Sequence, residues 1–332
     1  MTVGVVTVAA LLGYGLGLGV FGARIVAGRA WAGRAPRTAL LVWAGLVVAL
    51  TAAITLTGAA LALSTVPIST DLAAVLRTCV LALRGRYATP GGAALAGLGI
   101  VLVAGWLARL GYSLARAVIT AGRERHRHTQ LLTLVGRPDA RLDATVVDHD
   151  APAVYCVAGR SPTVVLTSTA RETLSAEQLD AALAHERAHL RGRHHLILTL
   201  AEGLAAAFPR VPLLAAARPE IGYLVELIAD DAAARRVGRL PVAAALVRVA
   251  GPHAPAAALA AGATAAAARV RRLLNPPATL GRGAGLVVAL AALALLAGPL
   301  ALTVVPTLLA GHPLLCPFGA PHGIAACALR PS

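Results

Sequence analysis

Residues 175–193 read SAEQLDAALAHERAHLRGR, and this stretch predicts a single amphipathic helix. Ser175 and Gln178 form a capping-box pattern, in which each side chain accepts a hydrogen bond from the other residue's backbone N–H. From residue 176 to about residue 193 the sequence is rich in strong helix formers, with apolar positions at helical spacing. We therefore expect the helix to begin at Ala176.

The predicted helix carries the pattern HExxH, formed by His185, Glu186 and His189. Histidines four residues apart lie on one helical face, so both imidazoles can reach a single zinc ion. Glu186 lies next to that face, where its carboxylate can act as a general base. Because the pattern fixes only three letters, an ordinary amphipathic helix with solvated charges is the competing interpretation.

A second helix is predicted from Ile221 to Val237, and it contains the stretch ELIAD. Glu226 and Asp230 are again four residues apart, so they share a face. A catalytic zinc site needs three protein ligands, and Glu226 is the predicted third ligand. Asp230 is predicted to accept the ring N–H of a ligand histidine, whereas Asp231 points about 100° away and is expected to be solvated.

The residues before and after these helices complete one small domain. Three short β-branched runs predict a small antiparallel sheet, at Ala144–Asp148, Val154–Val157 and Thr163–Thr167. The Ala-rich stretch Val242–Leu274 is predicted to be helical, with an interruption at Gly251-Pro252.

Four apolar runs are long enough to cross a bilayer, which takes about 20 residues. They agree with a mean hydropathy of +0.74 and a hydrophobic content of 58%. Every Asp and Glu except Asp71 lies between Glu124 and Asp231, so residues 112–282 are predicted to form one soluble domain between the third and fourth spans. The predicted spans are Val3–Gly22, Ala39–Leu63, Gly92–Leu110 and Gly283–Leu309.

The arginines predict the orientation in the membrane. They gather between the first two spans, after the third span and before the fourth, which favours the cytoplasm for residues 112–282. Residues 1–21 lack a positively charged start and a clear cleavage site, so we interpret them as a retained span. Both termini, including the short tail 310–332, are then expected outside the cytoplasm. The lipid bilayer is thus an expected partner.

The charge and the cysteines exclude other classes of site. The net charge is +15, but the arginines are spread over junctions between apolar runs, so no direct binding of nucleic acid is expected. Cys79, Cys156, Cys316 and Cys327 lack the spacing of a zinc ribbon. Whether Cys316 and Cys327 pair is left open.

The combination of HERAH at 185–189 and ELIAD at 226–230 resembles the gluzincin-type membrane peptidases. The BlaR/MecR-type antirepressor peptidases fit better than the HtpX-like and CAAX prenyl proteases, since three spans before a cytoplasmic zinc domain and one after it match the predicted order. The resemblance implies His185, His189 and Glu226 as ligands of one zinc ion, Glu186 as base and Asp230 as the orienting carboxylate. The predicted fold class is thus an α-helical multi-pass membrane protein, with four transmembrane helices and an inserted α+β gluzincin-type domain.

The function implied by the resemblance is a zinc endopeptidase that cleaves a cytoplasmic, BlaI-like transcriptional repressor. The sequence lacks a Ser-x-x-Lys pattern after the fourth span, so direct covalent β-lactam sensing is not expected. HtpX-like quality control of membrane proteins is the alternative, and a scaffold with a structural zinc ion is a third interpretation. A transporter is disfavoured because the spans contain almost no ionisable residues. Homo-oligomerisation is left open.

Several residues near the motifs have competing interpretations. Glu202 and Glu220 are alternatives to Glu226. Glu220 follows Pro219 at a predicted helix start, where the helix dipole favours a carboxylate, and Glu202 has no Asp four residues later. His194 and His195 leave the metal-facing stripe and are expected at the surface or near the membrane. Tyr223 and Arg235 are both candidates to polarise a substrate carbonyl, and the sequence does not choose between them.

Overall fold

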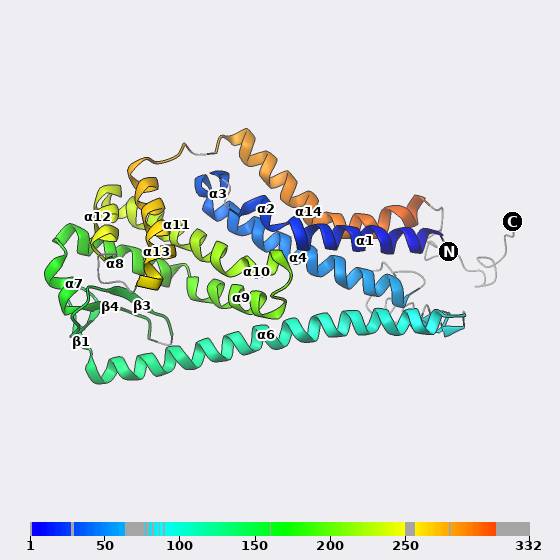
Figure 1. Cartoon of the computed structure of the whole chain (residues 1–332), viewed down its shortest axis with the longest axis horizontal. Coiled ribbons are helices and arrows are strands. Elements are labelled where there is room, and N and C mark those ends of the chain that lie inside the picture. Colours follow the sequence, from blue (N-terminus) through cyan, green and yellow to red (C-terminus); the bar gives the residue numbers. More distant parts are fainter. Residues whose placement is uncertain are drawn as a thin grey trace, which may run out of the picture.

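A computed structural model of the chain describes residues 2–27, 30–63, 77, 80, 81, 83–85, 87, 88, 90–159, 161–249, 256–278 and 280–309. The molecule is elongated, with a bundle of long helices at one end and a mixed domain at the other (Figure 1). Two predictions lie outside the described residues: the interruption at Gly251-Pro252 and the tail 310–332 with its two cysteines.

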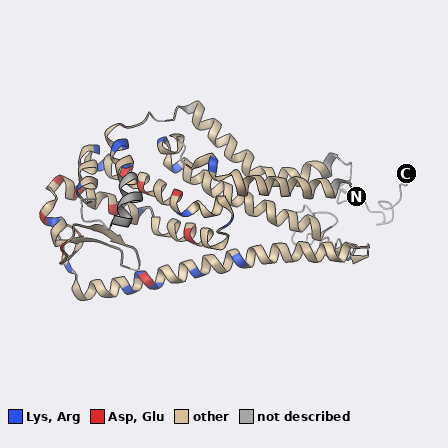
Figure 2. Cartoon of the chain, in the orientation of Figure 1, with Lys and Arg blue, Asp and Glu red and all other residues tan. Residues whose placement is uncertain are grey.

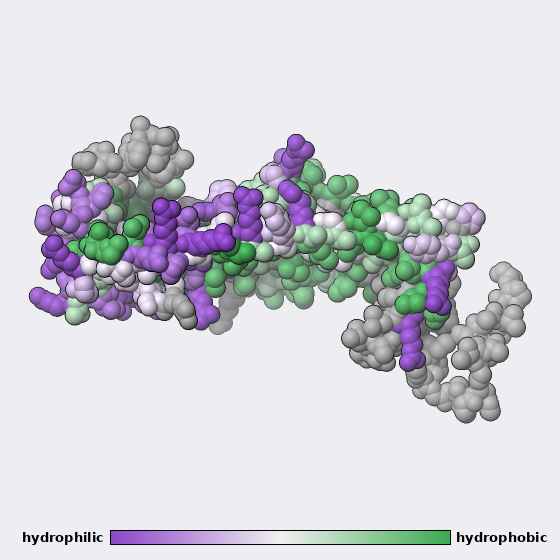
Figure 3. Space-filling view, turned by 90° about the horizontal axis from the view of Figure 1, so that it is seen from below, coloured by the Kyte–Doolittle hydropathy of each residue, from purple (hydrophilic) through white to green (hydrophobic). Residues whose placement is uncertain are grey.

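Four long apolar helices form the bundle, and each contains a stretch of membrane length. Their length and composition indicate a membrane protein, as the sequence predicted. Figure 3 shows hydrophobic side chains covering this half of the molecule and hydrophilic ones covering the opposite end. The helices are α1 (Thr2–Phe21), α4 (Pro36–Ala62), α6 (Gly92–Val135) and α14 (Arg282–Leu309).

Helix α6 continues well beyond the predicted end of the third span at residue 110. It has 44 residues, so at 1.5 Å per residue it is about 66 Å long. Its second half runs beside the mixed domain and leads directly into the first strand (Figure 1). Among the described residues, acidic side chains are confined to this end of the molecule (Figure 2).

Helix α4 packs against α1, α6 and α14 and is the centre of the bundle. Trp43 and Leu46 are fully buried there. Contact with α6 is closest where Gly58 faces Gly99, because a Cβ on Gly99 would collide with the Gly58 carbonyl and lie 2.8 Å from the Ala62 nitrogen. Two short helices follow α1, namely α2 (Ala23–Val26) and α3 (Ala30–Arg34).

The sheet has four strands in the order β1-β2-β4-β3, and its prediction as purely antiparallel is wrong. Strands β2 and β4 pair in parallel, whereas β1 with β2 and β3 with β4 are antiparallel. Strand β3 lies at the edge of the sheet, and β4 lies between β2 and β3. Residues Val164, Val165 and Leu166 of β4 are buried, as is typical of a central strand. The strands are β1 (Arg137–Asp139), β2 (Ala144–Val147), β3 (Val154–Val157) and β4 (Thr163–Thr167).

The remaining helices pack around this sheet and against the bundle. The capping box predicted at Ser175 is present, since the Ser175 hydroxyl accepts from the Gln178 N–H and the Gln178 side chain accepts from the Ser175 N–H. The HExxH helix α8 packs on α11, α12 and β3. The helices are α7 (Ser168–Thr173), α8 (Ala176–Arg191), α9 (His194–Ala207), α10 (Pro212–Ala215), α11 (Ala217–Val237), α12 (Arg239–Val249) and α13 (Ala256–Leu274).

The close approach of α4 and α6 yields a testable prediction. Gly99→Ala adds a methyl group against backbone atoms of α4, so we expect it to lower the free energy of unfolding by about 1–3 kcal/mol. Gly97→Ala, on the same helix with nothing within 4 Å of the added Cβ, should leave stability unchanged or raise it. Thermal unfolding of both variants in detergent micelles measures the difference. Equal stability of the two variants would contradict the packing described.

Candidate metal centre

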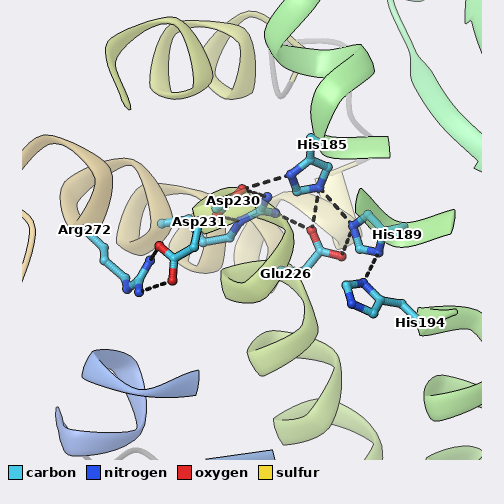
Figure 4. A network of polar contacts seen from close by, with 8 residues as sticks. His185, His189, His194, Glu226, Asp230, Asp231 and Arg272 are labelled. Carbon is cyan, nitrogen blue, oxygen red and sulfur yellow. Dashed lines mark hydrogen bonds and ion pairs between the residues drawn. The ribbon is translucent and has the colours of Figure 1, made fainter. Parts of the chain in front are cut away.

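Helices α8 and α11 bring three potential metal ligands together. His185 and His189 project from α8 and Glu226 projects from α11 (Figure 4). The two Nε2 atoms are 3.0 Å apart, and the Glu226 carboxylate oxygens lie 3.5 Å from each of them. The three side chains offer ligand atoms that all lie within 4.8 Å of one another.

The donor set fits a zinc ion. With zinc–ligand distances of about 2.0–2.1 Å, tetrahedral geometry separates neighbouring ligand atoms by about 3.4 Å. The separations between Nε2 of the histidines and the Glu226 oxygens are close to this value. Two imidazoles and one carboxylate also leave a fourth position for a water molecule, as catalytic sites require.

Asp230 lies directly behind His185. Its Oδ1 is 3.1 Å from His185 Nδ1, and its side chain is only 1% exposed. The contact occupies the ring nitrogen that faces away from the other ligands, so it holds the imidazole with Nε2 directed into the site. A spacing of four residues on α11 is what allows Glu226 and Asp230 to meet the same histidine.

Arg269 of α13 contacts both carboxylates, a role that no pattern in the sequence indicated. Its Nε and Nη2 donate to the two oxygens of Asp230 at 2.8 and 2.7 Å, and its Nη1 lies 2.8 Å from Glu226 Oε2. The side chain is 12% exposed. A fork-shaped guanidinium suits this bidentate geometry, and its charge compensates two carboxylates in a largely buried place. No local spacing in the sequence links α13 to α11.

Asp231, the neighbour of Asp230, is paired and not solvated, which corrects the prediction. Arg272 donates to its two carboxylate oxygens at 2.8 and 2.9 Å. Arg272 also donates to the carbonyl of Gly33 in α3 at 2.9 Å. Two Asp–Arg pairs therefore fix α13 to α11, and the second also reaches the segment between α1 and α4 (Figure 4 shows the Asp231–Arg272 pair).

His194 is likewise part of the site, although it was expected at the surface or near the membrane. Helix α8 ends at Arg191, and Arg193 adopts a left-handed backbone conformation with φ 48°. The chain therefore turns sharply, and His194 at the start of α9 lies with Nδ1 3.0 Å from His189 Nδ1 and is only 4% exposed. The sequence did not predict this contact, because we expected one continuous helix to residue 193, which would direct His194 away from His189. His195 lines a cavity beside the site, and its Nδ1 is buried without a hydrogen-bond partner in the described part of the chain.

The charges of the site depend strongly on these contacts. Burial alone would lower the pKa of His185, but its hydrogen bonds with Asp230 and Glu226 raise it to about 9. Burial and the nearby charge of His185 lower the pKa of His189 to about 4. Burial would raise the pKa values of Glu226 and Asp230, yet His185 and Arg269 lower both to about 2. Both carboxylates are thus ionised at neutral pH.

Glu186 is half-buried and lies next to Cys156 of β3. Burial raises its pKa, and interactions with His185 and with the thiol of Cys156 oppose that shift. Cys156 is a free cysteine on β3, and burial and the Glu186 carboxylate raise its pKa to about 12. Cys156 is therefore an uncharged neighbour of Glu186. The sequence did not predict this contact, because the spacing of the cysteines indicates no site.

Two cavities flank the site. One, of about 150 Å³, contains His185, Glu186, Glu226 and Arg269 and has an apolar wall formed by α12. The other, of about 460 Å³, lies between α6, β3 and α9 and includes His189 and Cys156. Neither cavity is lined by Tyr223 or Arg235, the two residues considered for polarising a carbonyl, nor by the alternative acids Glu202 and Glu220.

Comparison with known proteins identifies a related family. The model of Peptidase family M48 matches residues 121–315, a region that contains β1 to β4, α8, α11 and α13. No curated protein and no solved structure is similar enough to count as a match.

The position of Asp230 predicts its effect on metal binding. Asp230→Asn removes a charged partner of His185, so we expect the zinc affinity to fall about 10–100-fold. Asp231→Asn is the matched control, because its carboxylate pairs with Arg272 and touches no ligand. Competition for zinc with a fluorescent chelator measures both affinities in the purified protein. Equal weakening by the two variants would contradict the role assigned to Asp230.

The pKa of His185 predicts proton release on zinc binding. At pH 6.5 the metal-free protein has His185 protonated, since its pKa is about 9, while His189 is already neutral. Zinc must displace the His185 proton, so about one proton should be released per zinc ion. Calorimetry in buffers of different ionisation enthalpy counts these protons. Release close to zero at pH 6.5 would show that the Asp230 contact does not keep His185 protonated.

Proposed function

The chain belongs to peptidase family M48, and from this premise we propose that it is a membrane-bound endopeptidase that cleaves a cytoplasmic transcriptional repressor. The family makes it a zinc-dependent metallopeptidase, and the four apolar helices place it in a membrane. The observation that carries the proposed chemistry is the juxtaposition of His185, His189 and Glu226, with the half-buried Glu186 in a cavity beside them.

We assign His185, His189 and Glu226 as the ligands of one zinc ion per chain. When bound, zinc would polarise the scissile carbonyl and make a water molecule more acidic. Asp230 holds His185 in the tautomer that presents Nε2, and Arg269 keeps the carboxylates of Asp230 and Glu226 ionised and in place.

Glu186 is the proposed general base. Its carboxylate takes a proton from the attacking water and then delivers it to the amine of the leaving peptide. Burial raises its pKa, which improves its ability to hold the proton between these two steps. Its neighbour Cys156 has a raised pKa and so remains an uncharged hydrogen-bond partner.

The substrate is proposed to bind as an extended strand along β3. Strand β3 is at the end of the strand order and pairs only with β4 among the described strands, so its outer edge has free backbone groups. Val154 lines the smaller cavity and Tyr155 and Cys156 line the larger one, which places a cavity on each side of this strand. The apolar wall formed by α12 favours an apolar substrate side chain in the smaller cavity.

The arginines that flank the third and fourth spans support a cytoplasmic position for the domain. A substrate there would be a soluble protein or a cytoplasmic segment of a membrane protein. We favour a BlaI-like repressor, because the order of spans and motifs resembles the antirepressor peptidases. HtpX-like cleavage of damaged membrane proteins is the alternative within the same chemistry.

The role of Glu186 is tested with the full chain in proteoliposomes and purified candidate repressors. Glu186→Gln should retain zinc and lose cleavage by about 10²–10⁴-fold, because the amide cannot accept the proton. Glu177→Gln on the exposed first turn of α8 is the control and should cleave normally, and a chelator should stop cleavage by wild type. Equal cleavage by wild type and Glu186→Gln would refute the mechanism. Cleavage of an unfolded membrane protein with repressors left intact would favour the alternative.

A further inference from the structure

A third cavity lies in the helical bundle, away from the two that flank the metal centre. It is a cleft of about 290 Å³ between α1, α4 and α6. Helix α4 packs against both other helices and forms the floor, while α1 and α6 form the walls. The lining is almost entirely apolar and includes Leu11, Leu16 and Val20 of α1, Leu50 and Ile54 of α4, and Leu102 of α6.

The cleft covers only one half of the membrane. On α1 it extends from Leu11 to Val20, which corresponds to about 14 Å of helix and about half of a 30 Å hydrocarbon core. The turn between α9 and α10 closes the end nearest the peptidase domain, where Val211 approaches the backbone of Gly19. A transmembrane helix of another protein would need a groove across the whole bilayer, whereas a lipid chain occupies one leaflet.

The closed end of the cleft is polar. Arg210 lines it, is exposed, and makes no hydrogen bond or ion pair in the described part of the chain. Trp106 also lines it, and its indole Nε1 is buried without a hydrogen-bond partner in the described residues. An unpaired cation and an unpaired buried N–H therefore lie at the same end of an apolar cleft.

Contacts with neighbouring residues hold Trp106 in place. The ring of Trp106 stacks on Phe208 with centroids 4.0 Å apart and planes at 11°. The guanidinium carbon of Arg109 lies over the Phe208 ring, 5.9 Å from its centroid. The Nε of Arg109 donates to the carbonyl of Ala207 at 2.7 Å. Arg109 thus already has a partner, and Arg210 is the cation left to meet a ligand.

We propose that this cleft binds one acyl chain of an anionic phospholipid from the leaflet on the side of the peptidase domain. The phosphate pairs with Arg210, since guanidinium and phosphate form strong charge-assisted hydrogen bonds. The indole of Trp106 lines the cleft beside the glycerol backbone, at the depth where tryptophan is common in membranes. The apolar chain then fills the space between α1 and α6.

The proposal is tested with the full chain in detergent and two phospholipids that share the same acyl chains, phosphatidylglycerol and phosphatidylcholine. Native mass spectrometry of the complexes should show one retained phosphatidylglycerol, bound about tenfold more tightly than phosphatidylcholine. Arg210→Gln should remove most of this preference. Arg116→Gln, an exposed arginine on α6 outside the cleft, should keep it. Equal retention of both lipids, or an unchanged preference in Arg210→Gln, would overturn the proposal.

The acyl chain is located by fluorescence. Lipids brominated on the acyl chain should quench the emission of wild type more than that of Trp106→Phe, because Trp106 lines the cleft. Identical quenching of the two proteins would place the lipid elsewhere. A co-purified membrane protein that prevents lipid retention would show that the cleft accepts a helix, which would also overturn the proposal.

Discussion

The candidate metal centre depends on one buried carboxylate, that of Asp230. It is 1% exposed, and it lies between the imidazole of His185 and the guanidinium of Arg269. A charge in such a place is tolerated only when its partners are fixed, because its desolvation must be offset by close hydrogen bonds. Helices α8, α11 and α13 each supply one member of this chain of contacts. The requirement to satisfy Asp230 therefore sets how the three helices pack, and that packing sets where His189 and Glu226 meet.

The rest of the fold places this group beside a strand and away from the apolar bundle. The sheet presents β3 at its edge next to α8, and α12 covers the neighbouring cavity with apolar side chains. Helix α6 connects the two ends without a break, so the domain begins where a long helix ends. In the described part of the chain, the acidic residues lie at one end, which suits water, and the apolar helices lie at the other end, which suits lipid (Figures 2 and 3).

The sequence predicted the features that arise from local periodicity. The capping box at Ser175, both motif-bearing helices and the four apolar helices follow from residues a few positions apart. Contacts that depend on how the chain turns and packs were missed. Arg269 reaches Asp230 from another helix, and His194, only five residues after His189, reaches it because Arg193 turns the chain. The parallel pairing of β2 with β4 was also missed, because similar apolar runs suit either direction. Helix α6 extends beyond residue 110, the predicted end of the third span, because hydropathy marks the part of a helix that suits lipid and not the residue where the helix ends.

Arg269 and Arg272 lie on adjacent turns of α13 and hold different parts of the molecule. The first contacts the carboxylates of the metal centre, and the second contacts Asp231 and the backbone of Gly33 in the segment that joins two apolar helices. A displacement of that segment must either break the Arg272 contact or shift α13 along with it. Helix α13 therefore links the segment between α1 and α4 to the side chains of the candidate metal centre.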